Sequence, residues 1–133
     1  MIRALLDTNV LISAFFWNGP PRRVVDDAIV LKYSALTSVF ILQEVEEVLL
    51  RKPFSLSPIR VQQILRDILS YTTLVYEKKP KKKIQFKDKA DEKIINLAIG
   101  AKVDILVTGD RAVLSLKLKN LKILSPSEFL KIL

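Results

Sequence analysis

Short apolar runs alternate with longer amphipathic stretches along the chain. Because the apolar runs are continuous and do not alternate with polar residues, they indicate strands that are buried on both faces of a sheet. The amphipathic stretches have the spacing of helices that cover such a sheet. The pattern predicts strands at 2–6, 33–37, 72–76, 104–108 and 121–124, and helices at 9–17, 22–31, 39–52, 59–70, 88–101, 110–118 and 125–133.

Residues suited to helix ends support these boundaries. Pro20 and Pro21 suit a first helical turn, because proline fixes φ and has no amide hydrogen to donate. Ser38 is a good N-cap for the helix after the second strand, and Ser125 or Ser127 can cap the last helix. The order of elements predicts an α/β fold, a three-layer α/β/α sandwich around a central five-stranded parallel sheet. The length of 133 residues fits a single domain over 1–133.

Acidic residues follow two of the predicted strands. Asp7 comes directly after the first strand and Asp110 after the fourth, and in parallel sheets ligands bind outside the carboxyl ends of the strands. Each acid also has a structural explanation, since a helix cap contributes about 1 kcal/mol. Asp88, Asp91 and Glu92 likewise suit the start of a helix, where negative charge is favourable.

Helical periodicity separates some of these acids. At about 100° per residue, Asp91 projects toward the apolar face of its helix, whereas Glu92 projects into solvent. A carboxylate among apolar neighbours needs a partner, a proton or a cation. In the helix over 39–52, Glu44 and Glu46 lie on opposite margins of the apolar face, and periodicity does not choose between them.

The amino-acid composition limits which catalytic groups and metal ligands the chain can offer. The chain has no Cys and no His, which excludes disulfides, thiolate sites, a thiol nucleophile and an imidazole base. Carboxylates without His or Cys are the ligands that Mg²⁺ or Mn²⁺ prefers. The 22 Lys and Arg residues against 14 Asp and Glu residues favour a polyanionic partner. Since no apolar run has the length of a membrane span and no signal peptide is evident, a cytoplasmic protein without membrane association is expected.

Three segments together resemble the PIN-domain family of small metal-dependent nucleases, which includes VapC-like toxins of toxin–antitoxin pairs. The segments are LLDTNVLISAF, LTSVFILQEVEEVLLRKP and DKADEKIINLAIGAKVDILVTGDRAVL, in the family's order and across nearly the whole chain. The resemblance implies a ribonuclease that uses one or two Mg²⁺ or Mn²⁺ ions. It also implies an RNA substrate, an antitoxin partner and a homodimer. The implied catalytic and metal-binding set is Asp7, Glu44, Asp91 and Asp110, with Asn9, Ser38, Asp88 and Thr108 in support.

Basic and aromatic residues near predicted helix ends are candidates for contacts with RNA. Arg22, Arg23 and Arg111 lie near helix starts, where they suit phosphate contacts. A lysine cluster at 78–83 can grip a nucleic-acid backbone or be a solvated connection. The aromatic run at 15–17 can stack on bases or belong to the core or an interface.

Two other functional classes compete with the nuclease hypothesis. One is a catalytically weak or inactive PIN-like module that binds RNA in processing or decay. Many relatives carry an acid where this chain has Ala112, and Lys89 and Ala90 interrupt the acidic segment before Asp91. The other is a receiver-like phospho-acceptor domain, which the sequence disfavours because Asp7 stands alone after the first strand and Glu77, not Asp, follows the third.

Overall fold

Five parallel strands form the central sheet, in the order β3-β2-β1-β4-β5. The structure is a computed structural model and describes residues 1–77, 80 and 82–133. Three residues of the lysine cluster at 78–83, those at 78, 79 and 81, lie outside the described residues. The strands are β1 (Arg3–Leu6), β2 (Ser34–Thr37), β3 (Thr73–Leu74), β4 (Ile105–Val107) and β5 (Lys122–Leu124).

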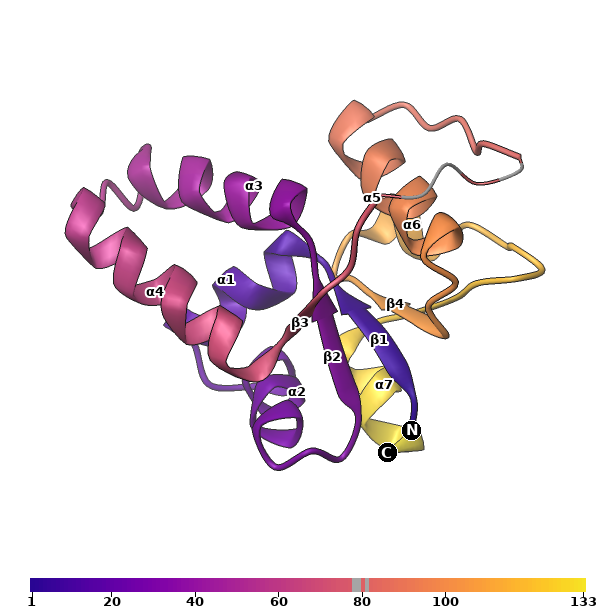
Figure 1. Cartoon of the computed structure of the whole chain (residues 1–133), viewed down its shortest axis with the longest axis horizontal. Helices are drawn as coiled ribbons and strands as arrows, with labels where there is room; N and C mark the ends of the chain where they lie inside the picture. The colour runs from indigo at the N-terminus through magenta and orange to yellow at the C-terminus, as the bar shows by residue number, and fades with distance from the viewer. Residues whose placement is uncertain (78–79, 81) are drawn as a thin grey trace.

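Helices connect the strands and cover both faces of the sheet, as the sequence predicts. Figure 1 shows α1 to α4 to one side of β1 and β2, and α5 with α6 to the other. Right-handed connections account for this division, because the chain moves one way across the sheet from β1 to β3 and the other way from β3 through β4 to β5. The helices are α1 (Thr8–Phe16), α2 (Pro20–Ile29), α3 (Val39–Leu50), α4 (Pro58–Tyr71), α5 (Lys89–Gly100), α6 (Arg111–Leu114) and α7 (Pro126–Ile132).

The central strands are buried on both faces, which explains their continuous apolar runs. Leu5 of β1 is paired with Leu36 of β2 and with Leu106 of β4, and all three side chains are buried. At the edges of the sheet, β3 and β5 are only partly buried. This gradient of burial places β1 at the centre of the core, so the residue that follows β1 is held on a rigid support.

Several boundaries differ from the prediction. The second helix begins at Pro20, because both prolines fit its first turn. The last helix is capped by Ser125, which forms a capping box with Glu128. The predicted helix over 110–118 ends at Leu114, and Leu116 and Leu118 then pack on the core. Their two-residue spacing is that of extended chain.

The third strand is shorter than predicted. Only Thr73 and Leu74 pair as strand residues, although 72–76 is rich in β-branched and aromatic side chains. The Val75 N–H donates to the Thr37 carbonyl at 2.8 Å, so the chain stays extended for one more residue. Beyond that point it leaves the edge of the sheet.

The described residues contain no helix that is both long enough and apolar enough to cross a bilayer.

Candidate carboxylate site at the carboxyl end of the sheet

The winding of the sheet reverses between β1 and β4, and two loops far apart in the sequence meet there. The Asp7 N–H donates to the carbonyl of Val107 at 2.9 Å, which joins the end of β1 to the end of β4. A reversal of this kind leaves a crevice at the carboxyl ends of the strands, where α/β proteins bind ligands. Asp7 and Asp110 therefore lie at the same edge of the sheet, as predicted.

Asp7 is the most deeply held acid of this crevice, with a residue exposure of 3%. One carboxylate oxygen accepts the Thr8 N–H at 2.7 Å, so Asp7 is also the N-cap of α1. The other accepts the Thr108 hydroxyl at 2.7 Å and the Asn9 side-chain amide at 3.3 Å. These donors fix the orientation of the carboxylate before any ligand arrives.

Thr108 and Asn9 tie the two loops together. The Thr108 hydroxyl donates to Asp7 and accepts the Asp110 N–H at 3.1 Å. The side-chain oxygen of Asn9 accepts the Gly109 N–H at 3.0 Å. Both were predicted as supporting residues, and the geometry gives each a specific contact. Asp110 itself caps α6 by accepting the Val113 N–H at 3.0 Å.

Glu44 enters the crevice from α3. Its carboxylate accepts the hydroxyl of Thr8, the residue that follows Asp7. Glu46 instead accepts a hydrogen bond from Gln62 of α4 at 3.0 Å, on the outer surface. Packing of α3 against α1 and α4 thus separates the two glutamates that periodicity left equivalent. Ser38, the predicted support on this element, is buried and caps α3 by accepting the Ile41 N–H.

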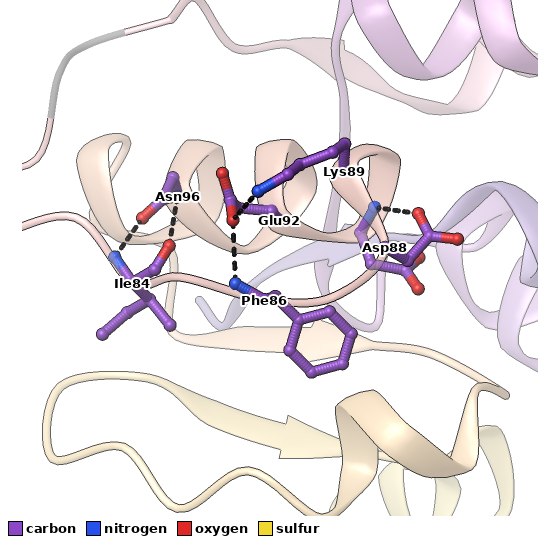
Figure 2. A network of polar contacts seen from close by, with 7 residues as sticks. Ile84, Phe86, Asp88, Lys89, Glu92 and Asn96 are labelled. Carbon is purple, nitrogen blue, oxygen red and sulfur yellow. Dashed lines mark hydrogen bonds and ion pairs between the residues drawn. The ribbon is translucent and has the colours of Figure 1, made fainter.

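Asp91 lies in the first turn of α5, so this helix positions it and the strands β1 and β4 do not. The side chain of Asp88 caps the helix by accepting the Asp91 N–H at 3.0 Å. Figure 2 shows this cap at one end of a polar network along α5. Asp88 therefore has the capping role that the sequence allowed for it, and it fixes the backbone from which the Asp91 carboxylate projects.

The rest of the network holds the segment before α5. Asn96 accepts the Ile84 N–H at 2.8 Å and donates to the Ile84 carbonyl at 2.9 Å, as a strand partner would. Glu92 accepts a hydrogen bond from the Phe86 N–H at 2.8 Å and forms an ion pair with Lys89 at 3.3 Å (Figure 2). Glu92 lies on the side of the helix away from the apolar face, as predicted, and it finds these partners there because the segment before α5 folds back along that side.

The pKa values of two of the acids respond to burial and to the neighbouring charges. Burial raises the pKa of Asp7 above its ordinary value of 3.8, although the bonds from Thr108 and Thr8 oppose the rise. Burial and the negative charges of Asp88, Asp7, Asp110 and Glu44 together raise the pKa of Asp91 from 3.8 to about 6. The neighbouring carboxylates thus disfavour ionisation of Asp7 and Asp91, and a bound cation would relieve this effect.

Two pockets lie next to each other at this site and share Asn9 and Ser13. The acidic pocket, of about 360 Å³, contains three of the four predicted acids. The Asp110 pocket, of about 350 Å³, contains the fourth. The acidic pocket is lined by Asp7, Thr8, Asn9, Ile12, Ser13, Trp17, Glu44, Val48, Phe54 and Asp91, and the Asp110 pocket by Asn9, Val10, Ser13, Pro21, Gly109, Asp110 and Pro126.

The three arginines predicted to contact phosphates come directly after lining residues of the Asp110 pocket in the sequence. Arg22 and Arg23 follow its lining residue Pro21 in the first turn of α2, and Arg111 follows Asp110. All three residues are exposed, and none of them lines the pocket itself.

The residues suit a hard metal ion by the chemistry of their donors. The predicted set offers carboxylate oxygens, with no sulfur or imidazole ligand to favour a softer metal. Across 1–77, 80 and 82–133, however, no three acidic side chains are arranged so that they would hold an ion as they stand. An ion bound without rearrangement would therefore be held by one or two carboxylates, with water completing its shell.

Sequence reasoning missed two residues that shape the site. Thr8 binds Glu44, and Gly109 donates its N–H to Asn9. Their positions directly beside the candidate acids, in DTN and TGD, were the available signal. The contacts themselves depend on how separate elements pack.

Comparison with known proteins agrees with this architecture. A sequence profile of the PIN domain matches residues 3–112. No curated protein matches the chain. Among solved structures, VapBC2 from Rickettsia felis bound to a promoter DNA fragment is 14% identical over 93% of this chain and 98% of that chain, with a TM-score of 0.66. DNA-bound VapBC from Salmonella typhimurium is 15% identical over 95% and 99%, with a TM-score of 0.68. At these identities the likeness shows the fold.

Proposed function

The chain belongs to the PIN-domain family, and from this premise we propose that it is a metal-dependent endoribonuclease of the VapC-like toxin type. The observation that carries the proposal is the convergence of Asp7, Glu44 and Asp91 on one pocket. Asp110 lies in the adjoining pocket. A basic chain with net charge +8 and an acidic crevice combines attraction for RNA with attraction for cations.

Each acid has a separate role in this proposal. Asp7 is a fixed ligand, because three donors orient its carboxylate. Asp91 and Glu44 line the same pocket from two helices and would hold the ion together with Asp7. Asp110 supports an ion at the mouth of the adjoining pocket. One or two bound Mg²⁺ or Mn²⁺ ions would polarise the scissile phosphodiester and activate water.

The remaining residues bind and position the substrate. The Thr108 hydroxyl links the Asp7 carboxylate to the Asp110 backbone, and Asn9 holds the loop after β4. Arg22, Arg23 and Arg111 contact phosphates on either side of the scissile bond. The VapBC structures are of complexes bound to DNA, which supports an antitoxin as protein partner. A homodimer and a cytoplasmic location are part of the same proposal.

Glu44 and Glu46 offer a matched test, since both are glutamates of α3 and only Glu44 lines the pocket. We expect Glu44→Gln to reduce cleavage of a structured RNA by about 10–100-fold, the loss typical when a group that supports a metal site is changed. The glutamine can still accept the Thr8 hydroxyl, so the change removes charge and leaves the contact. Glu46→Gln should cleave like the wild type.

The assay compares Mg²⁺, Mn²⁺ and EDTA with the three proteins. Cleavage that requires the metal and is lost only in Glu44→Gln supports the proposal. RNA binding without cleavage in any metal would contradict it and favour the non-catalytic RNA-binding module. Equal loss of RNA cleavage in Glu44→Gln and Glu46→Gln would show that cleavage does not depend on whether the glutamate lines the pocket.

A further inference from the structure

Four aromatic side chains cluster beside the acidic pocket. Phe16 stacks on Phe54 with ring centroids 4.6 Å apart and an interplanar angle of 17°. Phe15 packs edge-on against Phe16 at 5.0 Å. These three rings are partly buried and pack against the core. They form a rigid apolar support at the end of α1.

Trp17 is the exposed member of this cluster. Its ring lies 5.5 Å from Phe16 at a tilt of 51°, and 57% of the residue is exposed. Its backbone is fixed, because its N–H caps α1 by donating to the Ser13 carbonyl at 3.0 Å. A large apolar ring held at a fixed place and left open to solvent has a surface available to a ligand.

The same pocket joins this ring to the carboxylates. The apolar lining of the pocket consists of Trp17, Phe54, Val48 and Ile12. Its polar lining includes three acids. Its volume of about 360 Å³ lies within the usual range of ligand pockets, roughly 300–1,000 Å³. A ligand that fills it has a flat apolar part and, next to it, a group that a metal ion at the carboxylates would attract.

We propose that Trp17 is a base-stacking residue, and that the apolar end of the acidic pocket takes an unpaired nucleobase adjacent to the phosphate held at the carboxylates. This inference rests on the proposed function and assigns Trp17 as the residue that holds a base of the substrate. Every base has a face that stacks on an aromatic ring, so the subsite accepts any sequence. A base within a duplex is already stacked on its neighbours and does not enter.

Trp17 is the only tryptophan of the chain, so its fluorescence reports this subsite alone. The titration uses Asp110→Asn, which disables cleavage under the proposal and alters the adjoining pocket instead of the acidic one. With Mg²⁺ present, a single-stranded RNA decamer should quench Trp17 emission saturably. An abasic decamer of the same charge should quench it weakly, and the decamer annealed to its complement should do the same.

Variants test the ring directly through binding of a labelled decamer. Trp17→Ala should weaken binding by roughly 5- to 150-fold, the loss expected for one stacked base. Trp17→Phe should restore most of it, because phenylalanine retains a stacking face. Ile59→Ala is the matched control, an exposed apolar side chain on α4 that lines neither pocket. It should bind like the parent.

The outcomes separate this inference from the proposed function. Equal quenching by the decamer and the abasic decamer would overturn the stacking subsite, even if the wild type cleaves RNA. Absence of quenching by both decamers would also overturn the stacking subsite. The exposed ring of Trp17 would then serve another partner, such as a protein. Base-dependent quenching of Asp110→Asn, together with no cleavage of RNA by the wild type in any metal, would sustain the subsite and contradict the nuclease.

Discussion

Asp91→Asn should lose cleavage and gain stability. We expect its rate of RNA cleavage to fall by about 10²–10³-fold, the usual loss when one group that stabilises transition-state charge is removed. No hydrogen bond to the Asp91 carboxylate is present among residues 1–77, 80 and 82–133, so asparagine disturbs little of the fold. The loss therefore reports the charge of Asp91 and not a change in structure.

The stability gain follows from the raised pKa of Asp91. The folded value of about 6 lies above the ordinary 3.8, so the folded chain binds this proton more tightly than the unfolded chain. Stability consequently falls as pH rises from about 4 to about 6 and stays low above that range. With EDTA present, Asp91→Asn should melt at a higher temperature than the wild type at pH 7.5, and the difference should close near pH 4.

Asp67→Asn is the control for this pair of measurements. Asp67 is exposed on α4 and lines neither pocket, so the same chemical change there should alter neither cleavage nor the pH profile of melting. Asp91→Asn that cleaves at the wild-type rate would contradict the role given to Asp91. A melting difference of the same size at pH 4 and pH 7.5 would contradict the electrostatic explanation.

Asp7→Ala should lose both cleavage and stability, and Asp7→Asn should separate the two effects. Both changes remove the charge, so both should abolish cleavage. Alanine also leaves the buried Thr108 hydroxyl and the Thr8 N–H without an acceptor. We expect its free energy of unfolding to lie about 1–3 kcal/mol below that of Asp7→Asn, the cost of unpaired buried donors.

Asparagine retains enough of the hydrogen bonding to make this comparison. Its side-chain oxygen can accept the Thr8 N–H, and its amide can donate to the Thr108 hydroxyl oxygen. Urea unfolding of the two variants at neutral pH measures the difference. Equal stabilities would show that the contacts of Asp7 do not hold the two loops together.

The sheet and the acids at its strand ends could be predicted because they depend on local sequence. A largely apolar run such as 2–6, which is interrupted only at Arg3, favours a strand covered on both faces, and the five-stranded parallel sheet is confirmed. The residue that ends such a strand lies at the ligand-binding edge whatever its neighbours are. This reasoning located Asp7 and Asp110, and helical phase located Asp91.

Contacts between distant elements could not be predicted in the same way. Thr8 and Glu44 are 36 positions apart, and they meet only because α1 packs on α3. Periodicity describes one helix at a time, so it left Glu44 and Glu46 equivalent until the resemblance chose between them. The contact of Glu92 with Phe86 could not be predicted for the same reason, because Phe86 lies in a segment without helical or strand periodicity.

The capping and ligand interpretations of the acids turn out to be compatible. Asp7, Asp88 and Asp110 all cap helices. A cap uses only part of the acceptor capacity of a carboxylate, which has two oxygens and about four lone-pair sites. Local stability and a ligand site can therefore use the same side chains.

The most direct test of the carboxylate site is a calorimetric titration of Mn²⁺ into the wild type and into Asp91→Asn, without RNA. The account predicts saturable binding to the wild type and binding at least about tenfold weaker to the variant. Asp67→Asn should match the wild type. Equal affinity of the wild type and Asp91→Asn for Mn²⁺, or no binding to either, would contradict a metal site built from these acids.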